Sequence, residues 1–205
     1  MNRTFRQRLK FIRNSWNYRI EFLKWKINGK PLPPPHFVKQ RTINEYRRKF
    51  SLDTLLESGT YLGEMVDAQR KYFQNIISIE LSDDLYASAK NKFRAYQHIE
   101  ILHGDSGMLI QELSKNLNKP VLFWLDGHYS GGNTSKTDVE TPILTELNAI
   151  LKSIHPHVIL IDDARLFCGE HDYPTIEDLK QFIASIDKGY TLQDKDDIIR
   201  ITKTG

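Results

Sequence analysis

The sequence predicts an α/β fold in which helices wrap a mainly parallel sheet that an antiparallel hairpin completes. Three observations support this prediction. From residue 54 onward, short apolar runs alternate with segments of helical period. The connections between them are short, as in repeated strand–helix–strand units. The last two apolar runs, residues 190–193 and 198–202, are separated only by a polar turn, which favours a hairpin.

The expected elements follow in order along the chain. We expect a lead-in helix over residues 37–50 that covers the ligand-binding edge of the sheet. A helix that begins after Pro174 is expected to be capped by Thr175. The remaining helices are expected at 63–72, 83–96, 107–117, 142–154 and 175–185, and the parallel strands at 54–57, 76–80, 99–103, 121–126 and 158–162.

The length of 205 residues suits one domain with an appendage. We divide it into a basic helical arm (1–30), a proline-rich linker with the lead-in helix (31–50) and the α/β domain (51–205). The single cysteine, Cys168, excludes an intramolecular disulfide and a multi-cysteine zinc site. No apolar run approaches the roughly 18 residues of a membrane span. We therefore expect a cytoplasmic protein, either free or peripheral at a membrane.

The net charge of +3 conceals a strong asymmetry. Residues 1–50 hold 14 Lys and Arg against Glu21 and Glu45, a net charge of +12, whereas the remainder holds 15 basic and 24 acidic residues, a net charge of −9. Within the arm, one apolar stripe runs along a helix of about seven turns. Its members are Phe5, Leu9, Ile12, Trp16, Ile20, Leu23 and Ile27.

Three roles for this arm remain open. Its basic amphipathic helix suits an anionic membrane surface. The stripe equally suits packing on the domain or pairing with a second copy in a homodimer. The Arg-rich, acid-poor start also resembles an organelle transit peptide. Nucleic acid is the least favoured partner.

The first strand of the domain ends in a carboxylate and enters a turn with two glycines. Glu57, Gly59 and Gly63 lie in this strand-to-helix turn, where glycine lets the backbone approach a ligand closely. Tyr61 stands where a dinucleotide fingerprint has its second glycine, leaving little room for a pyrophosphate. The turn therefore indicates a nucleotide-like ligand other than NAD, or an ordinary strand–helix connection.

All five parallel strands end in acidic or polar side chains, at the edge where open α/β sheets bind ligands. Glu80 is placed to accept both hydroxyls of a ribose. Asp105 and Ser106 are placed to meet an adenine, unless Ser106 only caps the next helix. In chain order the strand-end residues are Glu57, Glu80, Asp105 with Ser106, Asp126, and Asp162 with Asp163.

Asp126, Asp162 and Asp163 end neighbouring strands and should converge, without neutralising bases nearby in the sequence. Such a cluster is costly unless a cation or protons offset it. Oxygen ligands favour Mg²⁺. In the alternative interpretation, one aspartate faces the amine of a cofactor and another caps a helix.

The segment that follows Asp126 is a loop of small polar residues. His128 is the natural general base because imidazole titrates near neutral pH. It equally suits a role as a ligand or as a hydrogen-bonding residue of the loop. Gly131 and Gly132 suggest a flap that closes over the substrate.

These motifs resemble those of cation-dependent O-methyltransferases, including catechol, caffeoyl-CoA and macrolide-sugar (macrocin-type) enzymes. The resemblance implies a Rossmann-like class I methyltransferase fold, with a seven-stranded, mainly parallel sheet and an antiparallel C-terminal hairpin. It implies Mg²⁺ at Asp126, Asp162 and Asp163. The catalytic residues that we expect beside this cation are His128, from the chemistry of its side chain, and Asp126. The resemblance also implies S-adenosylmethionine contacts at Glu57, Gly59, Gly63 and Glu80. From their places in the same turns and strand ends, we expect further cofactor contacts at Thr60, Tyr61, Leu81, Asp105, Ser106 and Asp126.

The chain departs from the catechol type in two places. Tyr129 replaces the catalytic lysine of that type, and the Asp162–Asp163 pair is more similar to the sugar enzymes. The leading hypothesis is a Mg²⁺-assisted O-methyltransferase for a hydroxyl of a sugar, glycan or small metabolite. The alternatives are a metal-dependent hydroxylase on the same scaffold and a non-catalytic, membrane-tethered binding module.

Overall fold

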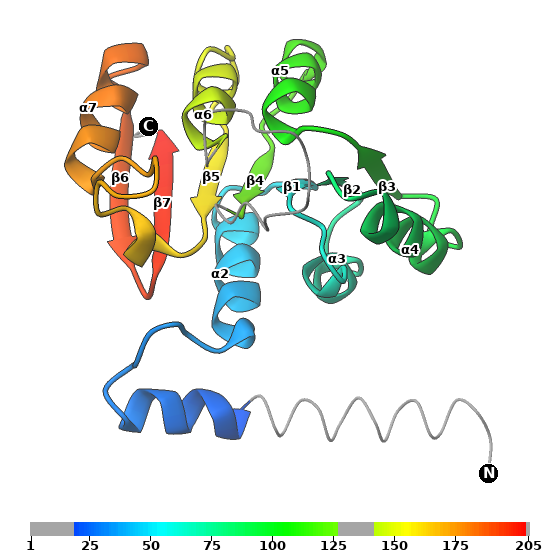
Figure 1. Cartoon of the computed structure of the whole chain (residues 1–205), viewed down its shortest axis with the longest axis horizontal. Helices are drawn as coiled ribbons and strands as arrows, with labels where there is room; N and C mark the ends of the chain where they lie inside the picture. The colour runs from blue at the N-terminus through cyan, green and yellow to red at the C-terminus, as the bar shows by residue number, and fades with distance from the viewer. Residues whose placement is uncertain (1–18, 127–141, 204–205) are drawn as a thin grey trace.

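The structure is a computed structural model that describes residues 19–126 and 142–203 (Figure 1). After a helix at residues 19–27, the chain alternates helices and strands. In chain order the further elements are α2 (His36–Lys49), β1 (Thr54–Ser58), α3 (Glu64–Gln69), β2 (Asn75–Glu80), α4 (Asp83–Phe93), β3 (Ile99–His103), α5 (Ser106–Asn116), β4 (Leu122–Leu125), α6 (Ile143–Leu151), β5 (Val158–Ile161), the 3₁₀ turn η1 (Ala164–Leu166), α7 (Ile176–Ile186), β6 (Tyr190–Lys195) and β7 (Ile198–Lys203).

The seven strands form one sheet in the order β3-β2-β1-β4-β5-β7-β6. Strands β1 to β5 are parallel, whereas β7 runs antiparallel to both β5 and β6. This is the mixed sheet with an antiparallel C-terminal hairpin that the sequence predicts, so the predicted class I methyltransferase layout is confirmed. In the described part of the chain, no helix is long and apolar enough to cross a membrane.

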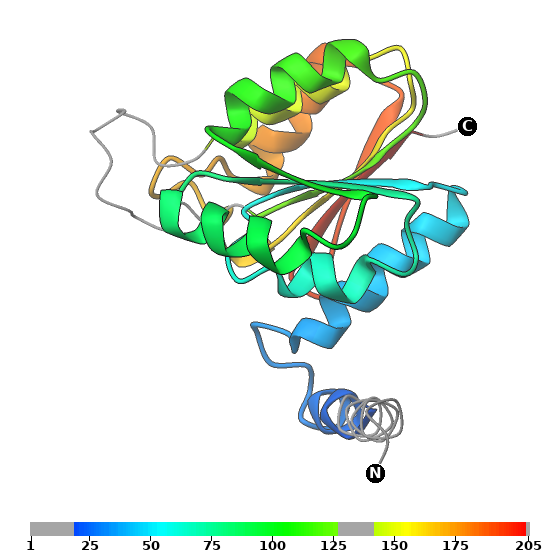
Figure 2. The ribbon, with the colours of Figure 1, turned by 90° about the vertical axis from the view of Figure 1, so that its right-hand side faces the viewer.

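Helices cover both faces of the sheet (Figure 2). Helices α2, α3 and α4 pack on one face, where Ile43, Val66 and Phe93 join one apolar cluster. Helices α5, α6 and α7 pack on the other, where Leu147 and Leu179 belong to a second cluster. The central strands are buried on both faces, as parallel strands in a layered fold must be. The two layers leave the carboxyl ends of the strands free to form a site.

Most expected elements differ from the structure by one or two residues at an end, and α3, α4 and α6 each end three residues before the predicted position. Helix α3 ends at Gln69, earlier than the predicted residue 72, because the chain turns at residues 71–72 to bury Phe73 before β2. Strand β1 extends to Ser58, one residue beyond the prediction. The predicted cap of α7 is confirmed, since Thr175 and Asp178 form a reciprocal capping box.

The helix at residues 19–27 joins the domain through aromatic side chains on one side. Trp25 is buried and donates its Nε1–H to the carbonyl of Pro31 at 2.9 Å, while Phe22 packs edge-on against Phe37. The stripe residues Ile20, Leu23 and Ile27 are 46%, 56% and 81% exposed. The described part of the stripe therefore does not pack on the domain, which leaves a second copy and a membrane surface as expectations for it.

Candidate functional site

The turn after β1 places two glycines in left-handed backbone. Gly59 has φ +81° and Gly63 has φ +66°. The amides of Gly59 and Thr60 both donate to the carbonyl of Ile79, which ties the turn to β2. A Cβ at Gly63 would lie 2.6 Å from the ring of Phe93, so this close backbone approach requires glycine. The predicted strand-to-helix turn is confirmed.

Glu57 lies buried beneath this turn. The Ser78 hydroxyl donates to Glu57 Oε2 at 2.5 Å, and the Thr60 and Ser78 hydroxyls are 2.6 Å apart. Burial raises the pKa of Glu57 to about 8, against the lowering effect of the Ser78 hydrogen bond. Without a ligand, Glu57 is therefore protonated at neutral pH.

Glu80 closes the same turn from the neighbouring strand. Its carboxylate accepts the backbone N–H of Tyr61 at 2.7 Å and that of Ser82 at 2.9 Å. Tyr61 itself takes φ +48° and exposes its ring, and Leu81, which follows β2, is also exposed. Each Glu80 oxygen retains a second lone pair for a ligand hydroxyl. The predicted ribose contact stays a prediction.

At the end of β3, the capping residue is Asp105 rather than Ser106. Asp105 Oδ1 accepts the N–H of Met108 at 2.9 Å, and Ser106 is the first residue of α5. The Ser106 hydroxyl interacts instead with Glu146 of α6, whereas the buried Ser58 hydroxyl has no hydrogen-bond partner among the described residues. The cofactor contacts of Asp105 and Ser106 stay predictions.

The sequence-based interpretation missed Glu146. This glutamate is 1% exposed, and burial raises its pKa to about 7 despite the Ser106 hydroxyl. Its Oε1 has no hydrogen-bond partner among the described residues. The signal was present in the sequence, because Glu146 shares the apolar face of α6 with Ile143 and Leu147. A buried acid thus lies beside the residues that end β1 and β3.

Asp126, Asp162 and Asp163 converge as predicted at the ends of β4 and β5. One carboxylate oxygen from each lies within 4.8 Å of the other two. The glycine turn is adjacent, since a Cβ at Gly59 would lie 3.2 Å from Cβ of Asp126. Burial raises the pKa of Asp162 to about 7, against the charge of Lys39. The oxygen-only donor set fits a hard divalent cation.

The expectation that no neutralising base lies near these aspartates in the sequence is wrong, because Arg165 stands two residues after Asp163. Lys39 of α2 donates to Asp162 Oδ2 at 2.6 Å and to Asp163 Oδ1 at 3.3 Å. Arg165 donates to Asp163 Oδ1 at 2.6 Å and also to Asp197. In the described residues, Lys39 and Arg165 thus pair with three carboxylates, those of Asp162, Asp163 and Asp197. A divalent cation would balance the remaining negative charge of this aspartate cluster. To bind there, it has to displace the ammonium group of Lys39.

We predict that Lys39→Met increases the affinity for Mn²⁺ about 10-fold or more, because it removes a competing positive charge from two buried carboxylates. Without metal, Lys39→Met should unfold at a lower temperature than wild type. Its unfolding temperature should rise again as Mn²⁺ is added. Calorimetric titration and thermal unfolding with Mn²⁺ measure both effects. Lys30→Met, which breaks the more exposed pair with Asp196, is the matched control. Equal Mn²⁺ affinity in wild type and Lys39→Met would contradict competition.

The predicted base His128 and the flap glycines Gly131 and Gly132 lie outside the described residues. A second histidine, His36 at the start of α2, is among the described residues near the site. Burial lowers its pKa, while the charges of Glu64 and Asp126 raise it. Sequence reasoning missed His36 because only the docking of α2 brings it to the strand edge.

Comparisons with known proteins place this geometry in a structural class. No family model and no curated protein matches the sequence. An O-methyltransferase from Bacillus cereus, solved with SAH (S-adenosylhomocysteine), is 11% identical with a TM-score of 0.61, over 91% of this chain and 90% of that one. An SAH-bound methyltransferase from Podospora anserina is 14% identical with a TM-score of 0.55, over 100% and 97%.

The N-methyltransferase NodS from Bradyrhizobium japonicum is also similar, with 13% identity and a TM-score of 0.53 over 82% of this chain and 95% of that one. Together these likenesses show that the chain has the fold of class I S-adenosylmethionine-dependent methyltransferases. Because the named relatives include both an O- and an N-methyltransferase, the fold does not identify the acceptor.

Proposed function

We propose that this protein transfers a methyl group from S-adenosylmethionine to a hydroxyl of a sugar, glycan or small metabolite, assisted by Mg²⁺. One observation carries the proposal. The glycine turn that would hold the cofactor is in contact distance of Asp126, which belongs to the three-aspartate cluster. Cofactor and cation would thus be adjacent at one edge of the sheet, as methyl transfer to a metal-polarised hydroxyl requires.

The residues divide between binding and chemistry in this proposal. Glu57 and Glu80 shape the cofactor turn through Ser78 and the Tyr61 amide. Asp126, Asp162 and Asp163 would hold the cation, which lowers the pKa of a hydroxyl bound to it. In the proposed transfer, the hydroxyl oxygen would bond to the methyl carbon while the carbon–sulfur bond of S-adenosylmethionine breaks. His128 is proposed to take the hydroxyl proton.

Calorimetric titration tests this function without knowledge of the acceptor. We expect wild-type protein to bind S-adenosylmethionine and SAH, and Mg²⁺ to strengthen binding in wild type but not in Asp126→Asn. No cofactor binding under any condition would refute the methyltransferase proposal and favour a non-catalytic module. Binding that ignores both Mg²⁺ and the substitution would retain the cofactor and remove the metal. Iron-dependent turnover without methyl transfer would favour the hydroxylase.

A further inference from the structure

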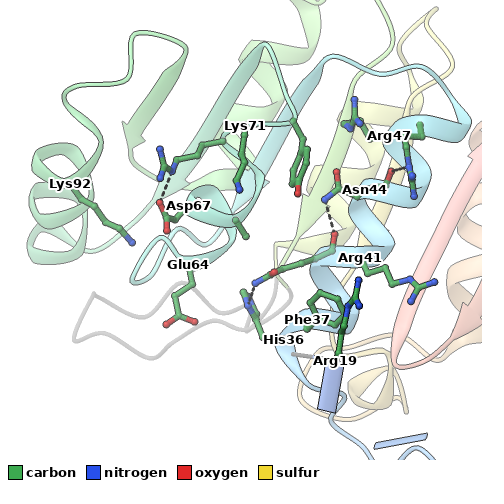
Figure 3. A pocket seen from close by; sticks show the side chains of 15 residues that line it. Arg19, His36, Phe37, Arg41, Asn44, Arg47, Glu64, Asp67, Lys71 and Lys92 are labelled. Atoms are coloured by element: carbon green, nitrogen blue, oxygen red, sulfur yellow. Dashed lines mark hydrogen bonds and ion pairs between the residues drawn. The ribbon is translucent and has the colours of Figure 1, made fainter. Parts of the chain in front are cut away.

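A basic pocket opens between α2 and α3, beside the proposed reaction edge (Figure 3). Its volume is about 770 Å³, within the range of small-molecule sites. The helix at residues 19–27 contributes Arg19, and α4 contributes Lys92. Its basic side chains are Arg19, Arg41, Arg47, Arg48, Arg70, Lys71 and Lys92, and its acidic ones are Glu64 and Asp67.

Most of this positive charge is uncompensated. Among the residues that the structure describes, Arg19, Arg41, Arg47 and Arg48 form no ion pair with a carboxylate. Asp67 is already paired with Arg70 at 2.8 Å. Four arginines that line one pocket repel one another, and a bound anion would reduce that cost.

The guanidinium of Arg47 is held between the pocket and the core. It lies 5.9 Å from the ring centre of Tyr72 and 5.8 Å from that of Phe73. Its Nε is buried and has no hydrogen-bond partner in the described structure. An arginine fixed on aromatic rings presents a rigid fork of donors. Such a fork suits the planar, bidentate recognition of phosphate or carboxylate oxygens.

The same helix connects this pocket with the aspartate cluster. His36 lines the pocket and hydrogen-bonds Gln40 at 2.8 Å, while Lys39 of the same turn reaches Asp162. Figure 3 shows His36 and Glu64 at one end of the pocket and Arg47 with Asn44 at the other. One ligand could therefore extend from the reaction edge along α2 to the arginines.

We propose that this pocket binds the phosphate group of a phosphorylated small-molecule acceptor, whose hydroxyl reaches the Asp126 edge. The inference rests on the proposed function and adds the substrate class to it. Phosphate fits better than carboxylate because several arginines meet the charge of a phosphate dianion or diphosphate. A concave site between two helices favours a small ligand over a flat membrane or a nucleic acid.

The test uses full-length protein and inorganic pyrophosphate as the probe. We expect wild type to bind pyrophosphate in calorimetry, more weakly at higher salt. The double variant Arg41→Ala/Arg48→Ala removes two exposed side chains of α2 and should bind about 10-fold more weakly or worse. Arg94→Ala, exposed and outside the pocket lining, should bind as wild type. Glucose 1-phosphate should bind where glucose does not.

SAH titration of the same samples separates the two proposals. SAH binding without pyrophosphate binding, or equal pyrophosphate affinity in wild type and the double variant, overturns the phosphate pocket alone. If wild-type protein does not bind SAH, the methyltransferase proposal is overturned instead. If anionic vesicles or RNA bind in a way that depends on Arg41 and Arg48 while pyrophosphate does not, the partner is a macromolecule and the proposal is wrong.

Discussion

Replacing Gly63 with alanine is expected to lower the free energy of unfolding by about 2 to 5 kcal/mol and to abolish SAH binding. Two costs add. A non-glycine residue at φ +66° pays roughly 1–2 kcal/mol for left-handed backbone. The new Cβ would also lie 2.6 Å from Cε2 of Phe93, a ring buried in the core, and overpacking of this kind costs about 1–3 kcal/mol.

Gly29→Ala separates these two costs. Gly29 has φ +78°, yet nothing lies within 4 Å of the position of its Cβ. This control should lose only the roughly 1–2 kcal/mol of backbone strain and should retain SAH binding. Urea denaturation and SAH calorimetry on both variants measure the difference. Equal destabilisation would show that Phe93 yields to the methyl group and that the close approach at Gly63 does not shape the cofactor turn.

The fold was predictable because its signals are local. The central strands β1, β4 and β5 are buried along their whole length, as in the apolar run Val158–Ile161. Helices carry an apolar face, such as that of Leu179 and Ile183 in α7. The hairpin follows from two strands joined by a polar turn. The rule that parallel strands share one carboxyl edge then places the acids together, including Asp126 with Asp162.

The charges around those acids were not predictable in the same way. Lys39 meets Asp162 across 123 residues of sequence, and only the docking of α2 on the sheet joins them. Arg165 stands two residues from Asp163, but the direction of its side chain depends on the left-handed backbone of that aspartate. Local sequence patterns thus identify the aspartates that would bind a cation. Tertiary packing decides which basic side chains compete with that cation for them.

Glu57→Gln is expected to flatten the dependence of stability on pH between about 4.5 and 8. Burial raises the pKa of Glu57 in the folded protein to about 8, from an ordinary value of 4.5. The folded state therefore binds more protons than the unfolded state in this window, and the free energy of unfolding falls as pH rises through it. The full effect is on the order of 5 kcal/mol, because one pKa unit corresponds to about 1.4 kcal/mol.

The difference in unfolding free energy between wild type and Glu57→Gln at each pH isolates the contribution of Glu57 from those of other titrating groups. Glu146 and Asp162, whose pKa values are raised by burial to about 7, act in the same direction. His157 acts oppositely, because burial lowers its pKa to about 4 and stability rises with pH between there and 6.5. Urea denaturation at pH 5 to 8.5, with the exposed Glu100→Gln as control, measures the difference. Parallel profiles for wild type and Glu57→Gln would contradict a protonated Glu57 beneath the glycine turn.

A protonated Glu57 also has a consequence for the proposed cofactor. S-adenosylmethionine carries positive charge, and a cation close to Glu57 favours the ionised carboxylate over the neutral acid. Cofactor binding near neutral pH should then release a proton from Glu57. Calorimetry in buffers of different ionisation enthalpy measures that release, which should disappear in Glu57→Gln. Equal proton release in wild type and variant would place the cofactor charge away from this carboxylate, although the buried acid would still shape the turn through Ser78.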